Sequence, residues 1–235
     1  MTTVFPFDED VKVNQGYRYT TNAPLSSQLS NSRISQEIIS NIPGKAKTLL
    51  DIGCGDGVYT QEIKDNFPSM KVSGFDPAPS AIAYAKEKYK HIKFYIDDIE
   101  RIKFFPKKKY DVAVVRGVLH HLSHPKIAIN AIPKFADYVI VVEPNGRNPI
   151  VKFIEKVSPY HRLHEEKSYP PDMIKKWFKQ SHMELISEAY IGYVPFFFPQ
   201  TLSKILYFLQ PYLEKSIVFS KFFSGQVVMV FHNLK

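Results

Sequence analysis

Residues 49–57 read Leu-Leu-Asp-Ile-Gly-Cys-Gly-Asp-Gly, and this stretch decides the fold. An apolar pair leads into an acid, three glycines follow at every second position, and a helix-like run begins at Val58. This order is typical of a strand that ends in a tight turn against a helix N-terminus. Glycine has no Cβ, so the turn can approach a ligand closely, and the helix end offers unpaired N–H groups. We expect a ligand-binding turn here, because a turn without a ligand does not require three alternating glycines.

Short β-rich runs alternate with helical runs around this turn. The predicted strands cover residues 47–52, 71–75, 92–96, 111–115 and 138–142. The predicted helices cover residues 27–41, 58–67, 80–89 and 125–136, the last disturbed by Pro133. This alternation predicts βαβ units and a parallel sheet, so the fold class is α/β. Further along, we expect helices over 149–157 and 171–180 and strands over 184–194 and 226–232.

Polar side chains follow the predicted strands at the points where the strands end. They are Asp51, Asp76, Asp98, Arg116 with His120, and Glu143. In an open α/β sheet the ligand lies beyond the carboxyl ends of the strands. We therefore expect these dispersed residues to converge on one cleft.

The spacing of the glycines distinguishes between nucleotide ligands. A dinucleotide turn needs glycines at its first, third and sixth positions, but here the third glycine is fifth and Val58 takes the sixth place. A phosphate loop is excluded because no Gly-Lys-Ser/Thr follows. Asp76 can accept hydrogen bonds from both hydroxyls of a ribose, Asp98 from an adenine amine, and Asp51 from an ammonium group. These acceptors fit S-adenosylmethionine better than any dinucleotide.

Four segments in order resemble the class I S-adenosylmethionine-dependent methyltransferases, in their small-molecule branch. They are residues 51–57, 74–77 (Gly-Phe-Asp-Pro), 96–99 (Ile-Asp-Asp-Ile) and 115–122 (Val-Arg-Gly-Val-Leu-His-His-Leu). The resemblance covers residues 47–145 closely and the last two strands loosely. It implies a Rossmann-like, seven-stranded, mostly parallel sheet flanked by helices, with the last strand antiparallel.

The same resemblance implies a cofactor site for S-adenosyl-L-methionine and its product S-adenosyl-L-homocysteine. Gly53 and Gly55 are expected to contact the cofactor through their backbone, Asp76 the ribose, and Asp98 with Ile99 the adenine. Arg116 departs from the small or acidic residue that relatives often carry near the methionine moiety. The full predicted set is Asp51, Gly53, Cys54, Gly55, Asp76, Pro77, Asp98, Ile99, Arg116 and Tyr19. Tyr17 and Tyr19 are expected to fold over the cofactor as part of an N-terminal lid.

Methyl transfer needs a base only when the acceptor must lose a proton. We predict His120 and Glu143 as catalytic residues, because a neutral histidine can take a proton from a hydroxyl. The alternative is that the histidine pair at 120–121 packs the short turn. Other polar residues expected near the cleft are Asn145, His161 and His164. No tight ligand spacing is present, so we predict no metal site.

Residues 195–225 form an aromatic insertion between the last two predicted strands. The insertion begins with Pro-Phe-Phe-Phe-Pro, and Lys204, Lys215 and Lys221 interrupt its apolar residues. Such helices can pack on the sheet, line a substrate pocket, form a homodimer face or lie on a membrane. The predicted organisation is an N-terminal helical cap over 1–46 and a methyltransferase domain over 47–235 that contains this insertion.

Charge and composition limit the function further. The net charge is +8, and a single cysteine excludes an intrachain disulfide. No N-terminal leader and no apolar run of about 18 residues is present, so we expect a cytoplasmic protein, with peripheral membrane contact as an alternative. The leading hypothesis is methyl transfer to a small, hydrophobic or lipid-linked acceptor at O, N or C. The alternatives are nucleic-acid methylation, which the net charge alone favours, and a cofactor-binding partner subunit without catalysis.

Overall fold

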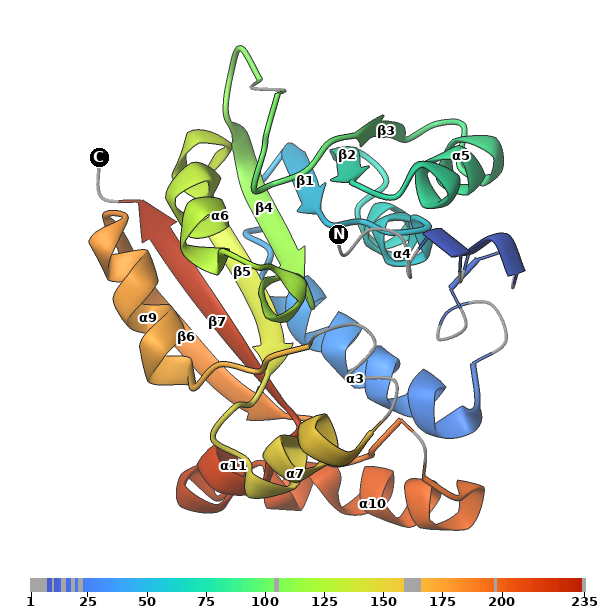
Figure 1. Ribbon diagram of the computed structural model, residues 1–235, viewed down its shortest axis with the longest axis vertical. Helices are drawn as coiled ribbons and strands as arrows, with labels where there is room; N and C mark the ends of the chain where they lie inside the picture. The colour runs from blue at the N-terminus through green and yellow to red at the C-terminus, as the bar shows by residue number, and fades with distance from the viewer. Residues whose placement is uncertain are drawn as a thin grey trace.

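The computed structural model describes residues 8–9, 11–13, 16–17, 20, 23–103, 106–158, 166–196 and 198–233. Within these residues the strands form one seven-stranded sheet in the order β3-β2-β1-β4-β5-β7-β6 (Figure 1). The strands are β1 (Thr48–Ile52), β2 (Lys71–Asp76), β3 (Lys93–Ile96), β4 (Tyr110–Arg116), β5 (Ala136–Pro144), β6 (Met183–Ile191) and β7 (Gln226–Asn233).

The directions of the strands confirm the predicted fold class. Strands β1 to β5 pair in parallel, and β7 runs antiparallel to both β5 and β6. β5 is longer than predicted because its pairing with β7 continues to Pro144, opposite Gln226. The carboxyl ends of β1, β2, β4 and β5 therefore lie at one edge of the sheet, as the sequence analysis requires.

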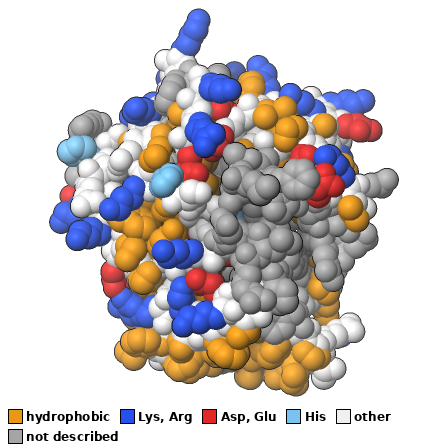
Figure 2. Space-filling model, in the orientation of Figure 1, with side chains coloured by type: hydrophobic (Ala, Val, Ile, Leu, Met, Phe, Trp, Pro, Cys, Tyr) orange, Lys and Arg blue, Asp and Glu red, His pale blue; other side chains and the backbone are white. Residues whose placement is uncertain are grey.

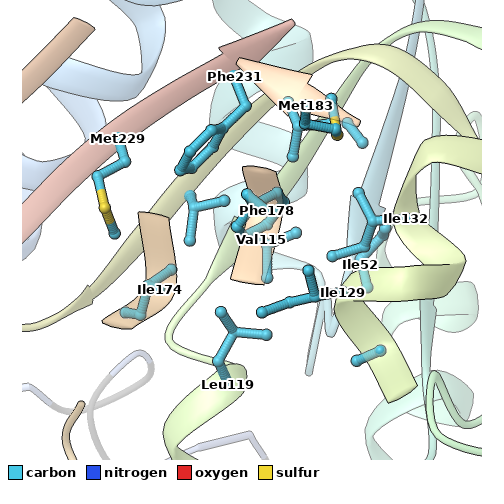
Figure 3. Close-up of a cluster of buried hydrophobic side chains, with 14 of the residues drawn as sticks. Ile52, Val115, Leu119, Ile129, Ile132, Ile174, Phe178, Met183, Met229 and Phe231 are labelled. Carbon is cyan, nitrogen blue, oxygen red and sulfur yellow. The ribbon is translucent and has the colours of Figure 1, made fainter. Parts of the chain in front are cut away.

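Helices cover both faces of the sheet (Figure 1). On one face, α3 (Leu25–Asn41) and α4 (Val58–Asn66) place Ile34, Ile38 and Ile63 in a core with apolar residues of the central strands. On the other face lie α6 (Pro125–Ala131) and α9 (Pro171–Gln180). There, Phe178 of α9 stacks on Phe231 of β7 with ring centroids 4.1 Å apart (Figure 3). α5 (Pro79–Lys88) packs beside β2 and β3.

The predicted disturbance of the helix over 125–136 has a direct physical cause in the sequence. The predicted helix over 125–136 ends early, at Ala131, and continues as the 3₁₀ turn η2 (Ile132–Lys134). Pro133 has no N–H for an α-helical hydrogen bond, so the α-helix stops before it. The prediction of a disturbed helix is therefore confirmed.

The segment after β5 carries the remaining helices. α7 (Pro149–Val157) follows β5, and α10 (Gln200–Leu213) and α11 (Ile217–Phe223) form the predicted insertion between β6 and β7. None of the helices in the described residues combines the length and the apolar character needed to cross a membrane. The proposed division at residue 46 stays a prediction, since α3 shares its core with the sheet.

Candidate cofactor and acceptor site

The glycine turn joins β1 to α4 and is hydrogen-bonded to the end of β2. The N–H groups of Gly53 and Cys54 donate to the carbonyl of Phe75 at 2.9 and 3.1 Å. Gly53 has a φ of +74°, and a Cβ there would lie 2.4 Å from Cγ2 of Val118. Gly55 has a φ of +55°. Both positions therefore require glycine, which adopts this backbone region without strain.

The carboxylate of Asp76, at the end of β2, joins this strand to the glycine turn that follows β1. Its Oδ2 accepts from the N–H of Gly55 at 2.9 Å, and its Oδ1 accepts from the N–H of Ala78 at 2.9 Å. Burial raises the pKa of Asp76 to about 6, although these two N–H groups act to lower it. A carboxylate has about four lone-pair sites, so each oxygen keeps one for a ligand hydroxyl.

Asp51 and Cys54 lie beside Asp76 in the same turn. Asp51 is buried, accepts from Oγ1 of Thr60 at 2.6 Å, and has its pKa raised by burial to about 6. Cys54 is buried, and a Cβ at Gly74 would lie 2.8 Å from its Sγ. Cys54 therefore fills the space that Gly74 leaves open, and the carboxyl groups of Asp51 and Asp76 lie beside it.

In the loop after β3, two neighbouring acidic residues have different burial and different hydrogen-bond partners. Asp97 is buried and its carboxylate accepts from the N–H groups of Asp98 and Lys103. Asp98 is half-buried and its Oδ1 accepts from the N–H of Glu100 at 2.9 Å. Ile99 is buried against the core. Asp97 thus shapes the loop. The predicted adenine contact of Asp98 and Ile99 stays a prediction, and so does the predicted cofactor contact of Pro77.

Asp56 has a role that the sequence analysis did not assign. It is buried and its Oδ2 accepts from the N–H of Tyr17 at 2.9 Å and from the hydroxyl of Thr20. The Tyr17 ring lies over the turn, so that a Cβ at Gly55 would be 2.6 Å from its Cε2. Asp56 therefore fastens the N-terminal segment onto the glycine turn. Tyr19, the predicted contact from the same segment, lies outside the described residues.

Arg116 turns toward the helices that cover the sheet. Its Nη1 donates to Oγ of Ser35 at 3.0 Å, its Nη2 donates to Oδ1 of Asn31 at 2.9 Å, and its guanidinium carbon lies 3.5 Å from the centre of the Tyr59 ring. A guanidinium over an aromatic face is a stabilising arrangement. Arg116 thus fastens α3 and α4 to the sheet, and its contact with the cofactor stays a prediction.

The short turn η1 (Leu119–His121) is organised by Glu143 from the end of β5. Glu143 is 1% exposed. Its Oε1 accepts from the N–H groups of Val118 and Leu119, and its Oε2 from the N–H of His120. The same Oε2 lies 2.8 Å from Nδ1 of His120. Because a carboxylate accepts only, Nδ1 carries the proton and Nε2 of a neutral His120 is left as an acceptor.

The environment of His120 acts on its pKa in opposite directions. Burial lowers the pKa, the adjacent carboxylate of Glu143 raises it, and the net pKa lies above the ordinary value of 6.5. The ring of His121 lies 3.8 Å from that of His120. Ligand atoms of His120, His121 and Glu166 lie within 4.8 Å of one another, close enough to share a metal ion. Glu166 is brought there by the N–H of Lys167, which donates to the carbonyl of His120 at 2.9 Å.

Of the other polar residues predicted at the cleft, the structure describes Asn145. Asn145 is fully buried, and its Nδ2 donates to the carbonyl of Lys221 at 3.1 Å and to Oγ of Ser224 at 3.1 Å. Asn145 thus holds the end of α11 against β5. His161 and His164 lie outside the described residues. The prediction that no metal is bound stays a prediction.

Known proteins are similar to this chain in sequence and in fold. A family model described as a methyltransferase domain matches residues 49–138. Malonyl-[acyl-carrier protein] O-methyltransferase 1 of Ilyobacter polytropus is 29% identical over 97 residues, which cover 40% of this chain and 35% of that protein. The chain spans about a third of the length of the curated relatives that it matches first.

Solved structures share the fold over the whole chain. The N-methyltransferase NodS from Bradyrhizobium japonicum, solved with S-adenosyl-L-homocysteine, has a TM-score of 0.66 at 16% identity and covers 100% of both chains. The [4+2]-cyclase SpnF has a TM-score of 0.70 at 15% identity and covers 99% of this chain and 97% of that one. Since one fold serves both chemistries, the fold alone does not establish methyl transfer. Residues 49–138 thus match a methyltransferase domain in sequence, and the sheet order of the chain is that of the Rossmann-like methyltransferase fold.

Proposed function

We propose that this chain transfers a methyl group from S-adenosylmethionine to a small, hydrophobic or lipid-linked acceptor. The carboxylate of Asp76 carries the proposal, because it is anchored to Gly55 and Ala78 and still has an acceptor site on each oxygen. The glycines of the turn keep this arrangement in place, because a Cβ at Gly53 would meet Val118 and a Cβ at Gly55 would meet Tyr17.

The residues of the chain take separate parts in this proposal. The bound cofactor would supply an electrophilic methyl group. Asp76 holds the ribose, Asp51 offers a carboxylate to the ammonium group, and the buried turn positions both. Positioning of this kind supplies much of the rate of a displacement reaction. Nε2 of His120 is the group that would take a proton from a hydroxyl or amine acceptor, with its ring oriented by Glu143.

The class of acceptor is supported by the relatives and by the surface beside β5. The Ilyobacter relative is named for an acyl-carrier-protein substrate. In this chain, Asn145 connects the end of β5 to α11, whose outer surface is apolar. An aromatic insertion attached in this way to the end of β5 fits a hydrophobic acceptor better than a nucleic acid.

Two measurements test the proposal. Calorimetry should detect binding of S-adenosyl-L-homocysteine, and incubation with methyl-labelled cofactor and fractionated extracts should label a small or lipid-linked product. No binding would exclude the proposal. Binding without any labelled product would favour the partner-subunit alternative, and label in RNA with salt-sensitive binding would favour the nucleic-acid alternative.

We expect the affinity for S-adenosyl-L-homocysteine to fall as the pH drops through about 6. Burial raises the pKa of Asp76 and of Asp51 to about 6, so below that pH each carboxyl must release a proton before it can accept from the ligand. Each required deprotonation weakens binding about tenfold per pH unit. Titration calorimetry between about pH 5 and 8 measures this. The Asp51→Asn variant should show a shallower fall, and an affinity independent of pH would contradict the assignment.

We expect His120→Gln to lower the rate of methyl transfer about a hundredfold while leaving the affinity for S-adenosyl-L-homocysteine unchanged. The matched control is His121→Gln, which changes the neighbouring ring and leaves the His120–Glu143 pair in place. We expect it to stay within about threefold of the parent rate. Equal losses in His120→Gln, His121→Gln and Glu166→Gln would instead indicate a shared metal ion.

A further inference from the structure

The outer surfaces of α7, α10 and α11 are apolar. Nineteen large apolar side chains are exposed among the described residues, and thirteen of them lie on these three helices. The most exposed are Phe153 of α7, Phe208 and Tyr212 of α10, and Ile217 and Val218 of α11, at 63%, 72%, 64%, 67% and 73%. Figure 2 shows hydrophobic side chains gathered along the edge of the molecule where α10 and α11 lie in Figure 1. We call this surface the apolar face.

The inward sides of the insertion helices are polar, which is the reverse of a helix packed on a core. In α10 the buried residues are Ser203 and Gln210, and in α11 the buried residue is Ser220. Oε1 of Gln210 accepts from the N–H of Tyr193 at 3.2 Å, and the hydroxyl of Tyr193 lies 2.9 Å from Oγ of Ser220. Rotating either helix would break these hydrogen bonds and bury polar groups without partners, so the apolar sides stay outward.

Exposed apolar side chains gathered on neighbouring helices mark a site of contact with another molecule. α11 is held beside α7 from within the chain, and α10 is connected to α11 through the hydrogen bonds of Tyr193. Nδ2 of Asn148, at the start of α7, donates to the carbonyl of Ser224, at the end of α11, at 2.9 Å. The three helices therefore present one surface, in the part of the chain that the structure describes.

The charges around the apolar face are positive. Lys156, Lys204 and Lys215 are exposed on or beside these helices. The acidic groups of the same segments are engaged within the chain. Glu214 accepts two hydrogen bonds from Nε and Nη2 of Arg33, and Glu155 accepts from Lys152 and Ser168. The surface thus joins apolar side chains to ammonium groups, as interfacial helices on anionic membranes do.

A groove between α3 and α10 repeats this chemistry on a smaller scale. It has a volume of about 540 Å³, and its apolar walls include Leu29, Phe208 and Tyr212. Lys204 and Lys215 also line it. An acyl chain beside an anionic headgroup matches these two kinds of wall.

We propose that the apolar face docks the protein on the surface of an anionic lipid bilayer. The aromatic and aliphatic side chains enter the boundary of the acyl region, and the lysines contact the headgroups. The helices lie in the plane of the interface, since none of the described helices can cross a membrane. This docking needs neither cofactor nor acceptor, so it stands or fails independently of the proposed methyl transfer.

Vesicle flotation with the full chain tests the proposal. We expect binding to phosphatidylcholine vesicles containing about one third phosphatidylglycerol, and at least tenfold weaker binding to phosphatidylcholine alone. The double variant Phe208→Ser/Val218→Ser should lose at least tenfold in affinity. The matched control is Ile186→Ser on β6, which removes a side chain that is 54% exposed outside the apolar face. It should bind as the parent does.

The contribution of charge is tested separately. The double variant Lys204→Glu/Lys215→Glu should weaken binding to the anionic vesicles by about 25-fold or more. Each lysine contributes about fivefold to the affinity, and the two contributions multiply. Lys90→Glu, an exposed lysine after α5, should have little effect. Equal binding to both vesicle compositions, or no binding to either, would overturn the proposal. So would a homodimer in solution that the Phe208→Ser/Val218→Ser variant dissociates, because the apolar face would then be covered by a second copy.

Discussion

Asp76→Ala should weaken binding of S-adenosyl-L-homocysteine by at least about a hundredfold. The variant loses both acceptors for the ribose hydroxyls, and hydrogen bonds to a charged group contribute about 1.5–3 kcal/mol each. It also releases the N–H of Gly55, which Asp76 holds at 2.9 Å. The loss therefore combines missing ligand contacts with a less ordered glycine turn. Calorimetry measures the affinity, and circular dichroism establishes that the variant is folded.

The matched control for Asp76 is Asp111→Asn at the amino end of β4. Asp111 also accepts backbone hydrogen bonds, from Lys47 and Thr48, but it lies at the opposite edge of the sheet. We expect its affinity for S-adenosyl-L-homocysteine to match the parent protein. If folded Asp76→Ala bound within about fivefold of the parent, the assignment of the ribose site to this carboxylate would be wrong.

Glu143→Ala should lower the free energy of unfolding by about 3–5 kcal/mol. Its carboxylate is 1% exposed and accepts from three backbone N–H groups and Nδ1 of His120. Removing it leaves these donors buried around a cavity, and the turn η1 loses the group that organises it. Urea unfolding at pH 7 measures the change.

Glu143→Gln keeps the volume of the side chain, so it tests the negative charge of Glu143 and its two acceptor oxygens. Its amide nitrogen would face N–H donors, so we expect a loss of about 2–3 kcal/mol and a rate of methyl transfer as low as in His120→Gln. The control is Glu188→Gln, because Glu188 accepts from the ammonium group of Lys175 near the surface. We expect that change to cost less than about 1 kcal/mol. A Glu143→Gln variant as stable and active as the parent would remove Glu143 from the site.

The features that could be predicted from the sequence depend on short stretches of chain. The turn at Gly53 and Gly55 needs a backbone that only glycine adopts freely, and the break at Pro133 needs only a missing N–H. Alternating strands and helices imply a parallel sheet, so the convergence of Asp51 and Asp76 followed from the topology. These conclusions depend on local rules that hold in any surroundings.

The roles that could not be predicted depend on partners far along the chain. Asp56 accepts from Tyr17, and Arg116 donates to Ser35. The two residues of each pair lie far apart in the sequence, so the periodicity of a helix or strand does not predict either contact. Asn145 looked like a polar residue of the cleft, yet it holds α11. Glu166 lies at the histidine pair because the N–H of Lys167 donates to the carbonyl of His120. A titratable residue at a strand end has several possible partners, and packing selects among them.

The sequence by itself determined the α/β fold, the place of the cofactor turn and the presence of an aromatic insertion, because periodicity and glycine geometry act locally. The tertiary structure decided how that insertion is oriented. An amphipathic helix has an apolar side whichever way it faces, and its pattern normally predicts that this side is buried. Here the hydrogen bonds of Gln210 and Ser220 hold the polar sides inward. The apolar face is therefore left for a partner, and long-range hydrogen bonds, not hydrophobic periodicity, determine that outcome.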